Sequence, residues 1–363
     1  MKKQILAILG MAMAMNCAAI KPSDMIPHDA SELPLLGTVA PDASKQYSRL
    51  PDSLKTRVRE ELWSLGLNSA GMAVRFSSDA TDIGARWKSL NKFSMNHMTA
   101  TGIRGLDLYV LGDDNKWTTV GSARPWLSDT TTTTRIMGGM ERRMREYMLY
   151  LPLYDGVDSL YILTDSAAMV AAPRLADMPQ RKNPVVFYGT SITQGGCATR
   201  PGMIHTSMLE RMLNREVINL GFSGNGKLDP EIAQLMAQVD ASVYVLEMLP
   251  NCTSDMLRER LVTFYEILRK SHPDTPILFV ESPMFPGSRH NAEEYNVLTE
   301  KNATLHGIYI SLLSRGDKFL FYMESERVMS NPEASVDNYH LTDLGFTDMA
   351  REFYPVLKTL IGQ

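Results

Sequence analysis

Ser191 stands where a chain could expose a nucleophile at the end of a buried strand. The stretch VVFYGTSITQGG, residues 185–196, runs from apolar and β-branched residues into a glycine, and the serine follows two positions later. A serine hydroxyl is a weak nucleophile until a base takes its proton. The string is neither the G-x-S-x-G elbow of α/β-hydrolases nor a P-loop, because Thr193 replaces the second glycine and no Gly-Lys-Ser/Thr follows. Taken alone, such a serine is more often a turn or helix-cap residue.

His340 is the predicted base for that serine. Among the seven histidines it has a feature that the others lack, because Asp337 precedes it by three residues in a loop that opens a helix. This spacing lets a carboxylate accept a hydrogen bond from one ring nitrogen and leaves the other nitrogen to take the serine proton. The rival base is His290, in a loop at the same expected sheet edge. The alternative for the 337–340 segment is an ordinary surface aspartate and histidine.

Two further segments offer donors for an oxyanion. FSGN offers the backbone N–H of Gly224, where the lack of a side chain permits close approach, and LPNC offers the side-chain amide of Asn251. Each has a simpler interpretation, as a glycine turn or as an asparagine that caps the next helix. The joint occurrence of all these pieces in one half of the chain is what favours acyl transfer.

Strands and helices alternate five times after a linker at 178–184, which predicts the elements that position these residues. The expected strands are 184–189, 216–221, 241–248, 275–282 and 319–324, and the expected helices are 202–214, 229–240, 253–271, 291–315 and 342–361. This alternation predicts a parallel sheet covered on both faces, a three-layer α/β/α domain at 183–363. Ligands gather beyond the C-terminal ends of such strands, where the chemically active segments fall.

The region before the linker has a different pattern. Runs of alternating apolar and polar residues are separated by Asp, Asn, Gly and Thr clusters, which predicts an antiparallel β-sandwich domain at 25–177, with one helix at 51–66.

The first residues predict export. Two lysines, an apolar run and small residues give residues 1–19 the pattern of a signal peptide, so the expected location is the periplasm or the cell surface. A buried N-terminal helix is the alternative. Cys17 stands where a lipoprotein is acylated, although the residues before it fit a lipobox poorly. No other segment is long and apolar enough to cross a membrane. The net charge of −4, without a basic stretch, argues against nucleic acid as a partner.

The motifs together resemble the four blocks of the SGNH (GDSL-like) hydrolases, over about residues 183–363. GTSITQGG resembles the subfamily with GSSITQG-type first blocks, whose N-terminal β domain carries Gly-x-Asp-Leu-Tyr; here GLDLY stands at 105–109. The resemblance implies a jelly-roll module ahead of a bacterial carbohydrate-esterase domain, with no cofactor and no metal. It implies these roles: Ser191 as nucleophile, His340 as base, Asp337 as its orienting partner, and Ser191 N–H, Gly224 N–H and Asn251 as oxyanion donors.

Two predictions concern residues beside these blocks. Arg200 either binds a sugar hydroxyl or acidic group of the substrate, or pairs with a surface carboxylate. Cys197 and Cys252 both flank catalytic blocks, so they form a disulfide if the blocks converge to within about 7 Å.

The sequence thus favours an exported serine esterase that removes acetyl or other small acyl groups from a sugar or polysaccharide. One alternative is a lysophospholipase or thioesterase with the same triad, whose acyl channel some of the 24 methionines would line. The other is a glycan-binding protein with a vestigial hydrolase domain, which the presence of all the catalytic residue types argues against.

Overall fold

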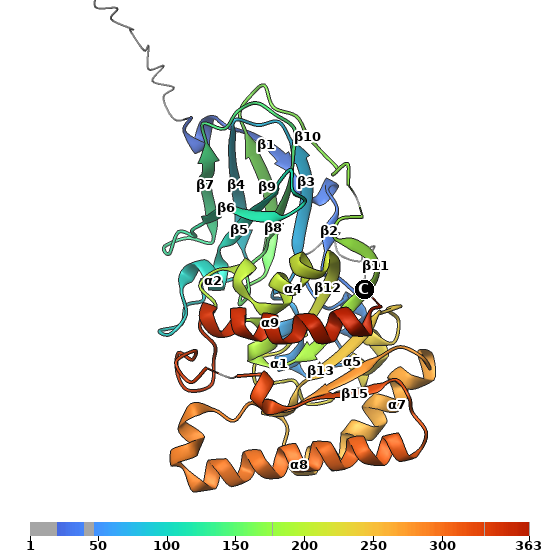
Figure 1. The fold of residues 1–363 in the computed structure, drawn as a ribbon. Helices are drawn as coiled ribbons and strands as arrows, with labels where there is room; N and C mark the ends of the chain where they lie inside the picture. The colour runs from blue at the N-terminus through green and yellow to red at the C-terminus, as the bar shows by residue number, and fades with distance from the viewer. Residues whose placement is uncertain (1–19, 40–46, 176, 330, 363) are drawn as a thin grey trace, which may run out of the picture.

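Two antiparallel sheets and one parallel sheet, with helices around the parallel one, form the part of the protein that the structure describes (Figure 1). The computed structural model describes residues 20–39, 47–175, 177–329 and 331–362. The predicted signal peptide and Cys17 lie outside the described residues. Within those ranges no helix combines the length and the apolar character needed to span a bilayer.

The antiparallel sheets form a jelly roll, as predicted. Their strands are β1 (Ile26–Asp29), β2 (Leu35–Leu36), β3 (Ala73–Ser78), β4 (Asp82–Ser89), β5 (Leu106–Leu111), β6 (Trp117–Ala123), β7 (Thr131–Gly138), β8 (Arg145–Tyr150), β9 (Val157–Thr164) and β10 (Val170–Ala171). One sheet has the order β1-β9-β4-β7 and the other β10-β3-β8-β5-β6, with β2 beside β3. Chain neighbours such as β3 and β4, or β8 and β9, thus lie in opposite sheets, so the two sheets share one apolar core that includes Phe76, Trp87 and Ile162.

The parallel sheet has five strands in the order β12-β11-β13-β14-β15. They are β11 (Gln180–Gly189), β12 (Arg215–Gly221), β13 (Val243–Glu247), β14 (Ile277–Val280) and β15 (Leu320–Met323). The chain adds β12 on one side of β11 and every later strand on the other. The direction in which strands are added thus reverses at β11, which makes the space between the ends of β11 and β13 a topological switch point. Such sheets bind ligands at this point, between the loops that follow the two strands.

Helices cover both faces of this sheet, which confirms the predicted α/β/α layers. They are α3 (Ser191–Gln194), α4 (His205–Leu213), α5 (Pro230–Met236), α6 (Ser254–Met256), α7 (Val262–Ser271), α8 (Ala292–Ser314) and α9 (Asp343–Leu360). Val185 and Phe187 on β11 face the layer that contains α4 and α9. Val186 and Tyr188 face the layer that contains α5 and α7. Both faces of β11 are buried, which explains its continuous apolar run.

The helix predicted at 51–66 is shorter than expected and packs outside the jelly roll. The structure has a 3₁₀ turn at Asp52–Leu54 and α1 at Glu60–Gly66, because Arg59 is extended where its guanidinium reaches Asp229. Leu54 and Leu62 lie in the same buried cluster as Tyr188 of the parallel sheet. A segment between two jelly-roll strands therefore contributes to the core of the hydrolase half. The remaining helix, α2 (Ala100–Arg104), precedes β5.

Candidate active site

Ser191, His340 and Asp337 meet beyond the C-terminal end of β11. His340 Nε2 lies 2.9 Å from Ser191 Oγ, and its Nδ1 lies 2.8 Å from Asp337 Oδ2. Both distances are those of hydrogen bonds. The chain thus places a hydroxyl, an imidazole and a carboxylate in the order that a serine nucleophile requires. The rival histidine, His290, ends a separate 3₁₀ turn that begins at Pro286.

Local hydrogen bonds hold Ser191 at the first position of α3. Thr190 caps this helix: its side chain accepts a hydrogen bond from the Ile192 N–H, and the Thr193 hydroxyl accepts one from the Thr190 N–H. Gly195 then ends the helix in the left-handed region, at φ 106°. The N–H of Ser191, at the start of a helix, has no acceptor within that helix. The serine therefore sits on a rigid turn with its N–H available.

A buried carboxylate that the sequence analysis did not single out anchors this turn. Glu247, at the end of β13, accepts hydrogen bonds from the Thr193 hydroxyl at 3.0 Å and from His205 Nε2 at 3.1 Å. Its side chain is 4% exposed. Thr193 stands where the G-x-S-x-G elbow motif would have glycine. Its hydroxyl links the serine turn to Glu247, a contact that glycine could not make. The sequence did contain a signal for this contact, since Glu247 ends an otherwise apolar strand. A carboxylate buried there needs hydrogen-bond donors, so partners for it could have been sought.

The carboxylate of Asp337 is held in its charged form. Partial burial favours the neutral acid, but hydrogen bonds from the His340 ring and from backbone N–H groups, together with the charge of that ring, outweigh burial and lower the pKa of Asp337. The N–H groups of Tyr339 and His340 both donate to Asp337 Oδ1, at 3.1 and 2.8 Å. Asp337 is therefore both ionised and fixed in orientation, so it can hold one tautomer of the imidazole.

The predicted oxyanion donors surround a cavity of about 470 Å³ beside Ser191. Asn251 Oδ1 accepts a hydrogen bond from the Gly226 N–H at 3.1 Å, which leaves the amide nitrogen of Asn251 to face the cavity. Gly224 also lines the cavity and adopts φ 67°, a conformation that favours glycine. Ser191, Gly224 and Asn251 follow β11, β12 and β13 in turn, so adjacent strand ends bring them together.

The predicted disulfide between Cys197 and Cys252 is wrong, because both thiols are free and buried. The Cys252 thiol donates to the Gly226 carbonyl, whereas the Cys197 sulfur lies within 4.8 Å of ring nitrogens of both His97 and His340. Burial raises the pKa of each thiol to about 12. A metal ion at the His97–Cys197–His340 group would have to displace Ser191 or Asp337 from His340, because both ring nitrogens have these partners.

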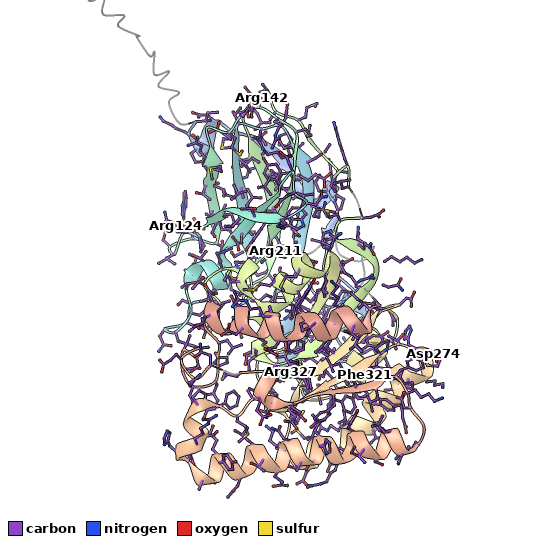
Figure 2. The ribbon with its side chains drawn as sticks, viewed as in Figure 1. Arg124, Arg142, Arg211, Asp274, Phe321 and Arg327 are labelled. Carbon is purple, nitrogen blue, oxygen red and sulfur yellow. The ribbon has the colours of Figure 1, made fainter. Side chains whose placement is uncertain are left out.

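Arg200 joins the two halves of the protein instead of facing the cavity beside Ser191. Its guanidinium donates to Asp107 Oδ2 at 2.5 Å and to the Tyr109 hydroxyl at 2.7 Å, both in the GLDLY segment of β5. Asp107 is fully buried and also accepts from the Gly202 N–H. Arg211 of α4, labelled in Figure 2, also contacts this segment, because its guanidinium lies 4.1 Å from the centre of the Tyr109 ring. The GLDLY segment therefore holds the jelly roll and the hydrolase half together through the contacts of Asp107 and Tyr109 with Arg200 and Gly202.

Replacing Arg200 with alanine is expected to lower the free energy of unfolding by about 3 kcal/mol, because it leaves the Asp107 carboxylate buried without its cation. Urea denaturation measures this loss. The matched control is Arg327→Ala, which removes an exposed pair with Glu352 at 3.2 Å. That change is expected to cost no more than about 1 kcal/mol. Equal losses of unfolding free energy in the two variants would contradict a stabilising role for the Arg200–Asp107 pair.

Comparison with known proteins assigns both halves of the chain to one kind of hydrolase. Residues 182–358 match the GDSL-like Lipase/Acylhydrolase family, and residues 26–170 match the N-terminus of SGNH-hydrolase-type esterases. A protein from Bacteroides ovatus described as a GDSL-like lipase is 30% identical, over 93% of this chain and 98% of that one, with a TM-score of 0.87. The salicylyl-acyltransferase SsfX3 from a tetracycline biosynthetic pathway shares the fold, at 17% identity and a TM-score of 0.74 over the same shares of the chains. No curated protein matches the chain.

Proposed function

Because the chain belongs to the GDSL-like lipase and acylhydrolase family, we propose that it is a serine esterase that removes acetyl or another small acyl group from a carbohydrate. The observation that carries this proposal is His340 between Ser191 and Asp337, within 2.9 Å of the hydroxyl and 2.8 Å of the carboxylate. The predicted signal peptide supports export as part of the same proposal, with the periplasm or cell surface as the site of action.

In the proposed reaction, His340 Nε2 takes the Ser191 proton as Oγ attacks the ester carbonyl carbon. The charge that develops on the carbonyl oxygen is bound by the N–H groups of Ser191 and Gly224 and by the amide of Asn251. His340 then gives its proton to the departing alkoxide, and an acyl-enzyme remains. A water molecule loses a proton to the same imidazole and attacks the acyl carbon. As the bond from that carbon to Ser191 Oγ breaks, the imidazole gives the proton to Oγ, which releases the carboxylic acid and restores the serine.

The cavity beside Ser191 favours a short acyl group over a long alkyl chain. Apolar side chains of Ile192, Phe285 and Val297 share its lining with the ionisable groups of Glu294 and Lys301. Burial already lowers the pKa of Lys301. Lys301 Nζ already donates to the Pro250 carbonyl at 3.2 Å, but a long chain would further desolvate both charged groups without adding a hydrogen bond, which is costly. This argues for an acetyl-sized group and against the lysophospholipase alternative.

A substrate panel tests this proposal. We expect the protein to release acetate from partially O-acetylated xylo-oligosaccharides or manno-oligosaccharides and from ethyl acetate, with a higher kcat/KM than for palmitoyl esters. Preference for the palmitoyl ester would instead support the lipid alternative. A folded protein that hydrolyses no ester would overturn the assignment.

Asn251→Ala is expected to lower kcat by about 10²–10³-fold with little change in KM, because the amide of Asn251 meets the oxyanion most strongly in the transition state. Asn251→Asp is the informative companion variant. It keeps an acceptor for the Gly226 N–H but removes the donor, so it should lose at least as much activity as the alanine variant. Near-normal turnover by Asn251→Asp would show that the residue only shapes its loop.

A further inference from the structure

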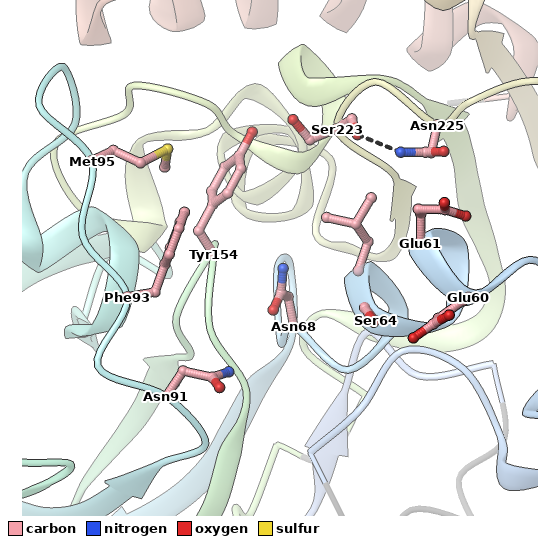
Figure 3. Close-up of a pocket in the computed structure, with 11 residues that line it drawn as sticks. Glu60, Glu61, Ser64, Asn68, Asn91, Phe93, Met95, Tyr154, Ser223 and Asn225 are labelled. Carbon is pink, nitrogen blue, oxygen red and sulfur yellow. Dashed lines mark hydrogen bonds between the residues drawn. The ribbon is translucent and has the colours of Figure 1, made fainter.

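A second cavity, of about 820 Å³, lies between the jelly-roll strands and the hydrolase half (Figure 3). Its walls come from α1, from the loop that follows β4, and from the loop that follows β12. In Figure 3, Phe93 and Met95 stand on one side and Glu60, Glu61 and Ser64 of α1 on the other, with Asn68 between them. The proposed chemistry at Ser191 uses none of these residues.

This inter-domain cavity adjoins the nucleophile. Tyr154 lines it and donates a hydrogen bond from its hydroxyl to the backbone carbonyl of Ser191, at 3.4 Å. Ser223 lines both this cavity and the smaller one beside Ser191. The two cavities are therefore neighbours that meet at Ser223, close enough for one ligand bound at Ser191 to contact both.

The cavity lies on the side from which an alcohol would leave. The oxyanion donors Gly224 and Asn251 line the smaller cavity, so the acyl group belongs there. The leaving oxygen takes its proton from His340 Nε2. The His340 ring lies 6.0 Å from the ring of His97, and the His97 loop also supplies Phe93 and Met95 to the inter-domain cavity. The alcohol part of an ester is therefore directed toward this loop.

The cavity carries polar groups ready to bind a ligand. Asn68 is only 8% exposed as a whole residue, and it lines the cavity. Figure 3 shows its side-chain amide pointing into the cavity. Asn91 donates through Nδ2 to Asp155 at 3.1 Å, which leaves its side-chain oxygen as an acceptor. A side-chain amide that faces a cavity offers one acceptor and two donor hydrogens, so it can bind a ligand that supplies both a donor and an acceptor.

The cavity also has a flat apolar surface and a negative rim. Phe93 is 46% exposed, and such a ring can cover an apolar face of a ligand. Among the described lining residues, Glu60 and Glu61 are the only acidic or basic ones, and both are exposed. The neighbouring Arg59, which donates to the lining residue Asn225, is paired with Asp229. Carboxylates there repel an anionic ligand at close range. Hydroxyl groups, apolar C–H faces and no negative charge are together the properties of a neutral or amino sugar.

We infer that the inter-domain cavity is the subsite for the alcohol part of the substrate, and that it binds a neutral or amino-sugar ring through Asn68, Asn91 and Phe93. This inference rests on the proposed esterase function. It assigns the jelly-roll side of the protein a direct part in substrate choice, since Asn91 and Phe93 lie in the loop between β4 and α2.

The test compares two acetyl esters that differ only in the alcohol. Partially O-acetylated xylo-oligosaccharides or manno-oligosaccharides would fill the cavity, whereas the two-carbon alcohol of ethyl acetate would leave it empty. Acetate release measures both reactions. We expect Phe93→Ala and Asn68→Ala to lower kcat/KM for the better oligosaccharide by about fivefold or more, an amount typical of one lost contact, and to leave kcat/KM for ethyl acetate unchanged.

Trp126→Ala is the matched control for Phe93→Ala, because Trp126 is a comparably exposed aromatic residue, 54% exposed, that is not part of the cavity lining. It should change neither reaction. If Asn68→Ala fails to fold, the exposed Phe93 still decides the question. An unchanged ratio of the two kcat/KM values in Phe93→Ala overturns the subsite. Hydrolysis of ethyl acetate but of neither oligosaccharide also overturns it while leaving the esterase intact, and hydrolysis of no ester counts against the proposed function itself.

A second comparison tests the charge argument. Wild-type protein should prefer the neutral oligosaccharide to O-acetylated homogalacturonan fragments, which carry a carboxylate on each sugar. Glu60→Gln combined with Glu61→Gln should reduce that preference, most clearly at low salt, because exposed charges are screened as salt increases. Equal use of the acidic and neutral substrates by the wild-type protein would refute selection against anions.

Discussion

Replacing Ser191 with alanine is expected to reduce kcat for ester hydrolysis by about 10⁴–10⁶-fold, the effect of removing the nucleophile from a triad that acts as a unit. Its Oγ is the atom that His340 Nε2 contacts at 2.9 Å, so the variant removes both the attacking atom and the proton that the imidazole would take. The hydroxyl is not part of the cap of α3, which depends on Thr190 and Thr193. The fold should therefore survive the change.

Ser242→Ala provides the control for this variant. Ser242 donates to the Pro184 carbonyl just before β13, at the opposite end of the sheet from Ser191, and its loss should leave kcat unchanged. A fluorophosphonate probe adds an independent measurement, because it should label the wild-type protein at one serine and leave Ser191→Ala unlabelled. Labelling at another serine, with activity retained in Ser191→Ala, would assign the chemistry elsewhere.

The parallel-sheet half is predictable from sequence because its signals are local. The run VVFY is apolar at every position, as a strand buried on both faces requires, and each such strand is followed by a helix of recognisable spacing. Once the strands are parallel, their C-terminal ends share one edge. Ser191, Gly224 and Asn251 then meet without any knowledge of side-chain contacts.

Arg200 shows what local signals cannot supply. Its partner Asp107 lies 93 positions earlier in the chain, in a strand of the jelly roll, so no spacing along the sequence relates the two residues. One signal did exist: an aspartate within the apolar strand GLDLY must find a cation or hydrogen-bond donors if it is buried. That signal shows that a partner is needed but does not identify it.

The predicted disulfide between Cys197 and Cys252 is wrong for a related reason. Position beside a catalytic block places a residue near the site but does not set the direction of its side chain. Cys197 adopts φ 72° and its thiol lies toward His97 and His340, whereas the Cys252 thiol reaches the Gly226 carbonyl. A disulfide needs both proximity and aligned Cβ vectors, and only the fold decides the second condition.

Asp337→Asn is expected to lower kcat by about 10⁴-fold, because an asparagine can present an amide N–H to Nδ1 and so stabilise the wrong imidazole tautomer. The low pKa of Asp337 means that the carboxylate is charged throughout the neutral and alkaline range. The loss should therefore be similar at every pH from about 6 to 9. A group with a depressed pKa contributes stability above its unfolded-state pKa and loses it as the pH falls through the folded value, so any stability difference between wild type and Asp337→Asn should be present at neutral pH and disappear in acid.

The stability of Asp337→Asn separates an orienting role from a structural one. The His340 and Asp337 side chains are 24% and 34% exposed, so their pairing should contribute no more than about 1 kcal/mol to folding at neutral pH. Activity and the urea midpoint should then diverge, with kcat nearly lost and the midpoint almost unchanged. Asp348→Asn, which removes a half-buried carboxylate 3.5 Å from the exposed Arg351 in the adjacent helix α9, should alter neither quantity. If Asp337→Asn kept most of its turnover, His340 would need no carboxylate partner, and the triad would reduce to a serine and a histidine.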